Sequence, residues 1–230
     1  MRLNKYIATA TGLSRRAADD AVYRNRVLIN GALPSAGQQV AASDNVSIDG
    51  NIISLPTNTI TIMLNKPVDY ICSREGQGGQ TIYELLPSSL QILKSIGRLD
   101  KNSSGLLLLT TDGELAQQLT HPKYEKIKCY VVMLDKPLAP LHHQMICDHG
   151  IQLPDGRSQL QLSRLPVERN ISLNRDNENN EMWQVTMQEG RNRQIRRTFE
   201  ALGYDVVKLH RTLFGGYQLG NLASGEYKII

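Results

Sequence analysis

The stretch GRLDKNSSGLLLLTTDGELAQQL, residues 97–119, joins a buried strand, two turns and the start of a helix. The four leucines at 106–109 predict a strand that is covered on both faces. Asp112 and Gly113 form a turn signal before a helix over GELAQQLT, and acidic residues favour the first turn of a helix. Asp100 lies in the loop that enters the strand. The pattern leaves two interpretations open: Asp100 caps the polar turn KNSSG, or it is a carboxylate at the edge of a dry pocket.

The elements predicted on both sides of this strand indicate an α+β fold. Strands outnumber helices and show no regular βαβ rhythm, which favours a mixed, mainly antiparallel sheet with flanking helices. The polar stretch NRDNENNE, 174–181, is typical of a loop between strands. The predicted strands are 61–67, 106–109, 128–134, 151–153, 158–165, 182–188 and 206–210, and the predicted helices are 81–87, 113–120, 141–149 and 193–203.

The first 55 residues follow a different order of elements. Leu3, Tyr6, Ile7 and Ala10 have helical spacing, and Ser14 can cap a second helix. A strand over 27–30 and a hairpin that turns at Asp49-Gly50 follow. The stretch PTNT at 56–59 is a plausible linker. We therefore expect an N-terminal domain at 1–55, a linker at 56–60 and a second domain at 61–230.

The net charge of +4 lies entirely in the first 31 residues, which hold six basic and two acidic side chains. The remaining residues hold 20 of each and sum to zero. A basic module on a neutral body suggests a polyanionic partner such as RNA or DNA, although a solvated helical face has the same composition. The basic residues of interest here are Arg2, Lys5, Arg15, Arg16 and Arg26.

Composition and missing motifs exclude several classes of protein. The hydrophobic content of 40% is ordinary for a soluble protein, and no apolar run is long enough for a membrane span. The N-terminus does not resemble a signal peptide, and three scattered cysteines suggest reduced thiols in the cytoplasm. GQGGQ at 76–80 is not a dinucleotide fingerprint, and the adjacent His142 and His143 would diverge on a helix. We expect no metal and no cofactor.

Three features can carry chemistry. The first is Asp100, whose charged form burial would disfavour unless a fixed cation lies nearby. The second is EGRNRQIRRTF, 189–199, whose helix can turn one guanidinium inward and leave the others for phosphates. The third is Tyr130 at the head of a strand, which could offer its ring to a planar substrate. Each also has a plainer interpretation: a turn cap, an exposed arginine stripe, or ordinary strand packing.

Together these motifs resemble the RsuA/RluB-type bacterial ribosomal RNA pseudouridine synthases along the whole chain. Residues 1 to 55, with LSRRAA and NRVLING, resemble an S4 RNA-binding domain. GRLDKNSSGLLLLTTDGEL resembles the family's catalytic motif and EGRNRQIRRTFEALGYDVVKLHR its C-terminal motif, while LNKP and LASGEY are similar to its flanking signatures.

The resemblance implies a role for individual residues. Asp100 would be the essential aspartate acting at C1′ of the target uridine, Tyr130 would pack on the base, and Arg196 would pair with Asp100. Arg98, Leu99 and Leu209 would line the substrate pocket. The implied RNA-binding residues are Arg2, Lys5, Arg15, Arg16, Arg26, Lys66, Arg191, Arg193 and Arg197.

The resemblance implies isomerisation of one uridine in ribosomal RNA by a monomeric cytoplasmic enzyme that flips its target base. HPKYEK and DGELAQQLTHP favour the large-subunit (23S) RNA as the target, with a small-subunit enzyme as the alternative. A non-catalytic assembly factor would have a broken GRLD motif, and an N-glycosidase would need a second carboxylate, for which there is no good candidate. Three positions depart from the family pattern: a short SREGQGGQT loop, Cys129 and Thr198.

Overall fold

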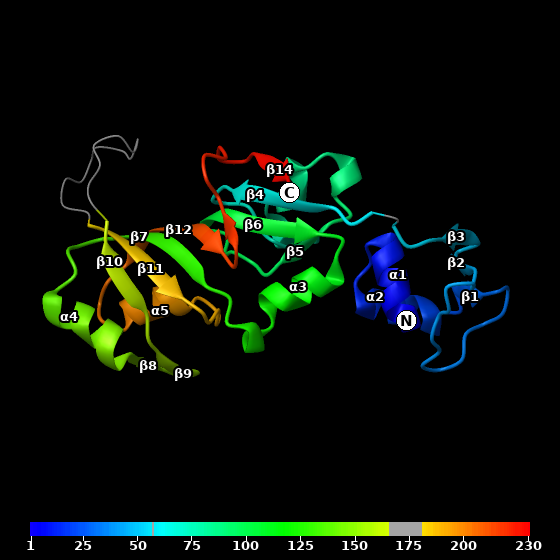
Figure 1. Ribbon diagram of the computed structural model, residues 1–230, viewed down its shortest axis with the longest axis horizontal. Helices are drawn as coiled ribbons and strands as arrows, with labels where there is room; N and C mark the ends of the chain where they lie inside the picture. The colour runs from blue at the N-terminus through cyan, green and yellow to red at the C-terminus, as the bar shows by residue number, and fades with distance from the viewer. Residues whose placement is uncertain (57, 166–180) are drawn as a thin grey trace.

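The computed structural model describes residues 1–56, 58–165 and 181–230. Figure 1 shows an elongated molecule with a small N-terminal unit at one end and a long sheet that occupies the rest. In these described ranges, no helix has both the length and the apolar character that crossing a bilayer requires. The α-helices are α1 (Leu3–Thr11), α2 (Arg15–Tyr23), α3 (Gly113–Thr120), α4 (Pro140–Gln144) and α5 (Gln194–Glu200).

The N-terminal unit packs two helices on a small sheet and has a core of its own. The Ser14 hydroxyl accepts a hydrogen bond from the Ala17 amide and caps α2 as predicted. The hairpin turns at Asp49 and Gly50, which both have positive φ, as a two-residue turn requires. Its strands are β1 (Val27–Ile29), β2 (Val46–Ile48) and β3 (Asn51–Ile53), in the order β1-β2-β3.

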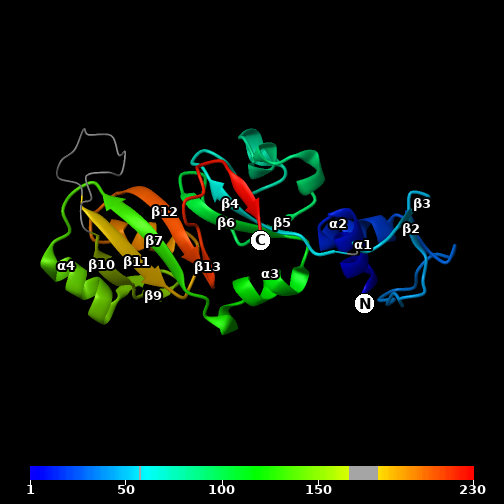
Figure 2. The ribbon, with the colours of Figure 1, turned by 45° about the horizontal axis from the view of Figure 1, so that its top comes forward.

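The second unit is built on a nine-stranded sheet whose main path runs β10-β11-β7-β12-β6-β4-β14, with β13 beside β12 and β5 beside β6. Figure 2 shows this sheet from a second direction, with α3 and α4 outside it. All pairs are antiparallel except β12 with β6, so the predicted mainly antiparallel α+β architecture is confirmed. The strands are β4 (Thr61–Lys66), β5 (Lys94–Ile96), β6 (Ser104–Thr110), β7 (Lys128–Leu134), β10 (Gln161–Arg164), β11 (Met182–Met187), β12 (Val206–Phe214), β13 (Tyr217–Gln218) and β14 (Tyr227–Ile229).

The four leucines of β6 are fully buried, because the strand lies in the middle of the sheet and is covered on both faces. Leu107 and Leu109 enter the larger core with α5, while Leu106 and Leu108 enter a second core with α3. Alternate side chains of one strand therefore join the two layers of the domain.

The predicted helices 81–87 and 141–149 are only partly confirmed. Ile82–Leu85 forms a short 3₁₀ turn, and the chain after α4 continues as a π-helical turn over Met145–His149. The predicted strand 151–153 is confirmed as β8 (Ile151–Leu153), which pairs with β9 (Gly156–Ser158) in a separate hairpin. The predicted strand 158–165 is shorter than expected: Ser158 ends β9, and the rest contributes β10. The predicted loop 174–181, except Glu181, and linker position 57 lie outside the described residues.

Candidate active site

Asp100 lies in the loop that joins β5 to β6, and the ammonium group of Lys66 holds this loop from behind. Lys66 Nζ donates hydrogen bonds to the carbonyl oxygens of Ser103 at 2.7 Å, Pro67 at 2.9 Å and Asp100 at 3.2 Å. The residue is fully buried, and burial lowers the pKa of its amine. The prediction that Lys66 contacts RNA is therefore wrong, because its charge serves the backbone of the Asp100 loop.

The Asp100 side chain is not a turn cap. Its main-chain carbonyl accepts from the Ser103 amide, but within the described structure its carboxylate accepts no hydrogen bond from the turn. One carboxylate oxygen, Oδ2, instead lies 3.5 Å from Arg193 Nη1. About a third of the Asp100 side chain remains exposed (33%), which leaves it accessible to a substrate. The turn-cap interpretation therefore does not fit this geometry, and the carboxylate lies beside a cation instead.

Arg193, and not Arg196, is the guanidinium that pairs with Asp100. Arg196 Nη1 donates to the Val206 carbonyl at 2.6 Å and Nη2 to the Asn102 carbonyl at 2.8 Å. Its side chain is buried, and burial lowers the pKa of its guanidinium. Arg196 thus makes no direct ion pair with Asp100 in the described structure. It donates to backbone carbonyls, one of them in the Asp100 loop, while the Asp100 charge acts on its guanidinium from nearby and favours its protonated form, which raises its pKa against the larger effect of burial.

Arg193 reaches Asp100 from an unusual backbone position. It is the N-cap of α5 and adopts the left-handed conformation, with φ 47° and ψ 31°. A non-glycine residue holds this conformation only when its surroundings determine it. The side chain is 45% exposed, so the ion pair lies at the protein surface.

The other predicted pocket residues, Tyr130, Leu209 and Leu99, are buried in the larger core. Tyr130 on β7 is opposite Arg211 on β12, and Leu209 is opposite Val132, so these side chains share one face of the sheet. The Tyr130 hydroxyl makes no hydrogen bond to the described residues, which leaves it available to a substrate.

Of the predicted pocket residues beside Asp100, Leu99 is fixed by sulfur contacts and Arg98 is exposed. The Cys72 thiol donates to the Leu99 carbonyl at 3.4 Å, and the Leu99 amide donates back to Cys72 Sγ at 3.5 Å. Burial raises the pKa of this thiol, so Cys72 is a neutral packing group.

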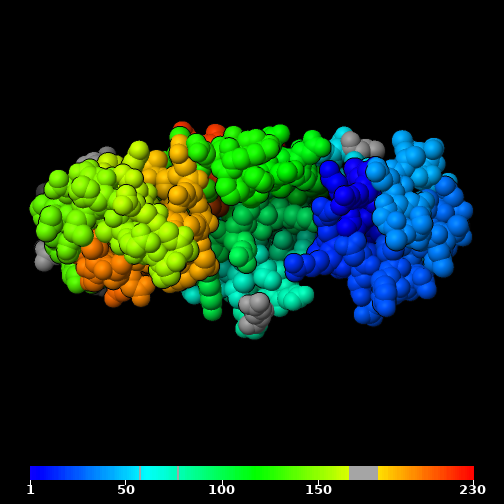
Figure 3. Space-filling model, turned by 90° about the horizontal axis from the view of Figure 1, so that it is seen from below, coloured from blue at the N-terminus to red at the C-terminus, as the bar shows by residue number. Residues whose placement is uncertain are grey.

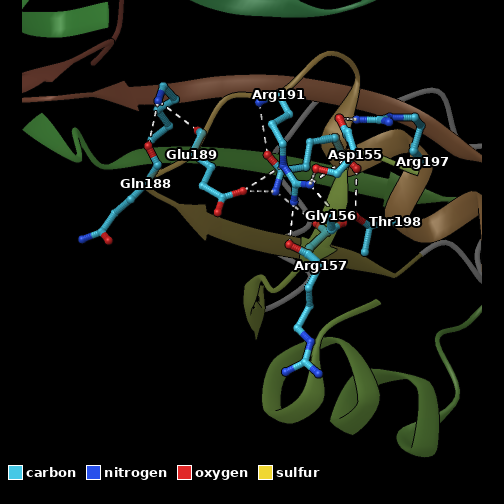
Figure 4. Close-up of polar contacts among 11 residues, drawn as sticks. Asp155, Gly156, Arg157, Gln188, Glu189, Arg191, Arg197 and Thr198 are labelled. Atoms are coloured by element: carbon cyan, nitrogen blue, oxygen red, sulfur yellow. Dashed lines mark hydrogen bonds and ion pairs between the residues drawn. The ribbon is translucent and has the colours of Figure 1, made fainter. Parts of the chain in front are cut away.

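Arg191 and Arg197 do not extend towards solvent as the RNA-binding prediction required. Figure 4 shows both side chains converging on the turn at Asp155, whose carboxylate contacts Arg191 Nη1 at 3.2 Å and Arg197 Nη2 at 2.7 Å. Their guanidinium groups are used by the protein itself, and the interpretation of 189–199 as a phosphate-binding stripe is corrected for these two positions. The sequence signal that could have indicated this is the turn Pro154-Asp155-Gly156 ahead of the arginine segment.

The basic residues of the N-terminal unit lie on its surface. Arg2, Lys5 and Arg15 line one shallow pocket with Met1, and Arg16 is exposed beside them. Arg26 differs, because its guanidinium pairs with Asp49, and Arg26 Nε donates to Asp49 Oδ1 at 2.8 Å. Among the described residues, no group of three or more His, Cys, Asp or Glu side chains is arranged to hold a metal ion.

Comparison with known protein families identifies the family of this chain. The profile of RNA pseudouridylate synthases matches residues 60–201, which include Asp100, Tyr130 and the arginine segment. The chain belongs to the RNA pseudouridylate synthase family. It is therefore a pseudouridine synthase, an isomerase that modifies RNA.

Full-length relatives agree with this membership. Ribosomal small subunit pseudouridine synthase A of Pasteurella multocida (strain Pm70) is 35% identical over 99% of this chain and 95% of its own length. Ribosomal large subunit pseudouridine synthase B of Bacillus subtilis (strain 168) is 35% identical over 98% of this chain and 90% of its own length. A crystal structure of a pseudouridylate synthase superposes with a TM-score of 0.68 at 30% identity, covering 100% of this chain and 96% of that one. The relatives' names cover both ribosomal subunits and do not select one for this chain.

Proposed function

We propose that this chain converts a specific uridine of ribosomal RNA to pseudouridine, with Asp100 as the essential carboxylate. The observation that carries the proposal is the Asp100–Arg193 pair, with its oxygen and nitrogen 3.5 Å apart, at a partly exposed position in the GRLD motif. The names of the full-length relatives support ribosomal RNA as the substrate.

The reaction explains why so few side chains suffice. The N1–C1′ bond of uridine breaks, the uracil rotates, and C5 bonds to C1′, so atoms and electrons balance within the substrate. A carboxylate at C1′ can act as a nucleophile, stabilise a cationic sugar or remove a sugar proton. Arg193 holds the Asp100 carboxylate in place through their ion pair.

We assign the predicted pocket residues to the detached base. The Tyr130 ring would stack on the uracil, and Leu99 and Leu209 would close the pocket so that the base turns without escaping. Since C1′ and C5 are inaccessible in a stacked nucleotide, the target must leave its stack before it reacts.

We further propose that residues 1–55 form an S4-type RNA-binding domain, joined through residues 56–60 to a catalytic domain at 61–230. The surface cluster of Arg2, Lys5, Arg15 and Arg16 supports this role, since cations that face solvent are free to meet phosphates. A monomeric enzyme in the cytoplasm fits this arrangement.

We place the target in large-subunit (23S) RNA, on the HPKYEK and DGELAQQLTHP context of the sequence. A small-subunit target is the second candidate, which the name of the Pasteurella multocida relative favours. Mapping pseudouridine in both ribosomal RNAs of a deletion strain decides between them: the missing modification will lie in one of the two.

The catalytic assignment is tested by tritium release from C5-labelled uridine in ribosomal RNA of that strain. Asp100→Asn keeps the shape of the side chain but removes its charge, and we expect release to fall below detection. Asp69→Asn is the matched control, because Asp69 is exposed and its amide bonds to the neighbouring Lys101 carbonyl. Release that persists in Asp100→Asn would remove Asp100 from this role, and free uracil as the product would indicate an N-glycosidase.

A further inference from the structure

The β8–β9 hairpin stands apart from the nine-stranded sheet, and the catalytic proposal gives it no role. Its turn, Pro154-Asp155, packs against the segment 188–198, which leads into α5 (Figure 4). This segment carries four arginines: Arg191 and Arg197 pair with Asp155, Arg193 pairs with Asp100, and Arg196 donates to the backbone.

The Asp155 carboxylate connects the two arginines on either side of Arg193. Its Oδ1 lies 3.2 Å from Arg191 Nη1, and its Oδ2 lies 2.7 Å from Arg197 Nη2. Arg197 is one helical turn beyond Arg193 in α5, and Arg191 is two residues before it. One carboxylate therefore fixes the chain on both sides of the residue that reaches the catalytic acid.

Main-chain carbonyls of the hairpin complete this contact. Arg191 Nη1 also donates to the carbonyls of Asp155 at 3.1 Å and Gly156 at 3.0 Å, and Nη2 donates to that of Arg157 at 2.7 Å. Gly156 has φ +116°, and a Cβ there would lie 3.3 Å from Arg191 Nη1, which explains why the turn has glycine at this position. The guanidinium is thus enclosed by the turn rather than resting on its surface.

A buried hydroxyl chain joins the same hairpin to α5. Ser158 Oγ lies 2.8 Å from Thr198 Oγ1 and accepts from Gln194 Nε2 at 3.1 Å. Thr198 Oγ1 in turn donates to the Gln194 carbonyl at 2.8 Å. Thr198, one of the departures from the family pattern, therefore serves the contact between the hairpin and the helix.

We infer that Asp155 is a positioning residue for the catalytic ion pair. By holding Arg191 and Arg197, it keeps Arg193 in its left-handed backbone conformation and aims that guanidinium at Asp100. This inference rests on the proposed role of Asp100. It is distinct from a simple stabilising role, because it requires the effect of Asp155 to pass through Arg193.

The test is Asp155→Asn, which keeps the side-chain shape and removes the charge that the two arginines share. Asp148→Asn is the control, since Asp148 is an exposed carboxylate just before the same hairpin. The first readout is the single-turnover rate of tritium release at saturating ribosomal RNA, with RNA affinity and unfolding midpoint measured in parallel. The second, independent of activity, is the Arg193 side-chain Nε–Hε NMR signal, assigned with Arg193→Lys.

We expect Asp155→Asn to lower the rate about 10- to 100-fold, as small misplacements of catalytic groups do, with RNA affinity near wild type. The Arg193 signal should shift in Asp155→Asn and stay in place in Asp148→Asn. An unchanged rate, an unchanged Arg193 signal, or a loss confined to RNA affinity would each overturn the inference. If Asp155→Asn does not fold, Arg197→Gln carries the test with the same expectations.

Failure of the catalytic proposal has a different signature. If Asp100→Asn still releases tritium, the role of Asp100 is lost whatever Asp155 does. If Asp100→Asn is inactive while Asp155→Asn matches wild type, only the positioning inference is lost.

Discussion

Lys66 and Arg196 show how this site uses cations whose charge never reaches the substrate. Each is buried, and each donates to main-chain carbonyls around the loop that carries Asp100. A buried ammonium or guanidinium without such acceptors would be strongly destabilising. Each buried charge therefore needs these carbonyl oxygens, and its hydrogen bonds in turn fix the conformation of the loop. The loop that carries Asp100 is thus held through its backbone as well as through the Arg193 ion pair.

We expect His210, beside Leu209 on β12, to make the stability of the fold depend on pH. Its Nδ1 lies 2.9 Å from Ser104 Oγ in the strand that follows Asp100. Burial, and to a lesser degree the charge of Lys208, lowers the pKa of His210 below the ordinary value of 6.5. At pH values between this lowered pKa and 6.5, His210 therefore binds a proton in the unfolded chain but not in the folded chain.

The sign of the effect follows from this difference in bound protons. The free energy of unfolding should fall as pH decreases from about 7.5 to 5.5, by at most about 1.4 kcal/mol per pH unit from this residue. His210→Gln should flatten that dependence in urea unfolding, while His149→Gln, which alters an exposed histidine, should not. Equal slopes in wild type and His210→Gln would show that His210 does not cause the dependence.

At the residue scale, the sequence indicates the acid but not its partner. Asp100 is identified because GRLD precedes a run of leucines, and a carboxylate there needs an explanation. The choice among Arg191, Arg193, Arg196 and Arg197 depends on helix phase and on the left-handed backbone at Arg193, which periodicity does not encode. The predicted RNA contact of Lys66 fails for a similar reason, since a motif gives a residue type but not the direction of its side chain.

Between elements, the two halves of the sheet meet at β6 and β12. The two strands pair only through Ser104 with His210 and Gly105 with Arg211 in the described structure. Gly105 has φ +104°, and a Cβ there would lie 2.3 Å from the Arg211 carbonyl oxygen. Arg211 also donates from Nε to the Leu106 carbonyl at 2.8 Å, and this hydrogen bond helps to hold the backbones of β6 and β12 close together at Gly105.

Gly105→Ala should therefore be strongly destabilising, by about 3 kcal/mol or more, because both the clash and the positive φ oppose a side chain. The strands must separate to accept the methyl group, and the Asp100 loop lies at the same junction. Urea unfolding measures the loss. Gly113→Ala is the matched control, since nothing lies within 4 Å of its Cβ position and it begins α3. Similar stability of the two variants would contradict this account of the junction.

Predictions for elements succeed where the local pattern and the tertiary structure agree. The strand at 128–134 and the helix after Asp112 form as predicted, because alternation and capping specify them locally. The predicted strand 151–153 forms as β8, but the sequence does not predict that it pairs with β9 in a hairpin apart from the main sheet, since that arrangement depends on contacts with α5. The parallel pairing of β12 with β6 has no local signal at all, because it joins residues more than a hundred positions apart.

At the scale of the whole molecule, the basic unit and the catalytic unit lie at different places along one long axis (Figure 3). They touch where Lys94 Nζ donates to the Ala8 carbonyl at 2.7 Å and where Ile92 packs within 3.0 Å of the Cβ position of Gly12. Both contacts use the C-terminal end of α1. The side of α2 that carries Arg15 and Arg16 is exposed and takes no part in these two contacts.

Arg15→Ala combined with Arg16→Ala should weaken RNA binding without altering the chemical step. Each lost phosphate contact should lower the slope of log affinity against log salt by about 0.7 to 0.9, so the pair should flatten it by roughly twice that. The single-turnover rate at saturating RNA should stay near wild type, because neither residue contacts the Asp100 loop. Lys136→Ala with Arg164→Ala is the matched control, since it removes two exposed charges of the second unit, one between β7 and α4 and one at the end of β10. If neither double variant changes the salt slope, the basic N-terminal unit does not bind RNA. If the Arg15→Ala, Arg16→Ala variant has a lower rate at saturating RNA, these arginines act in the chemical step.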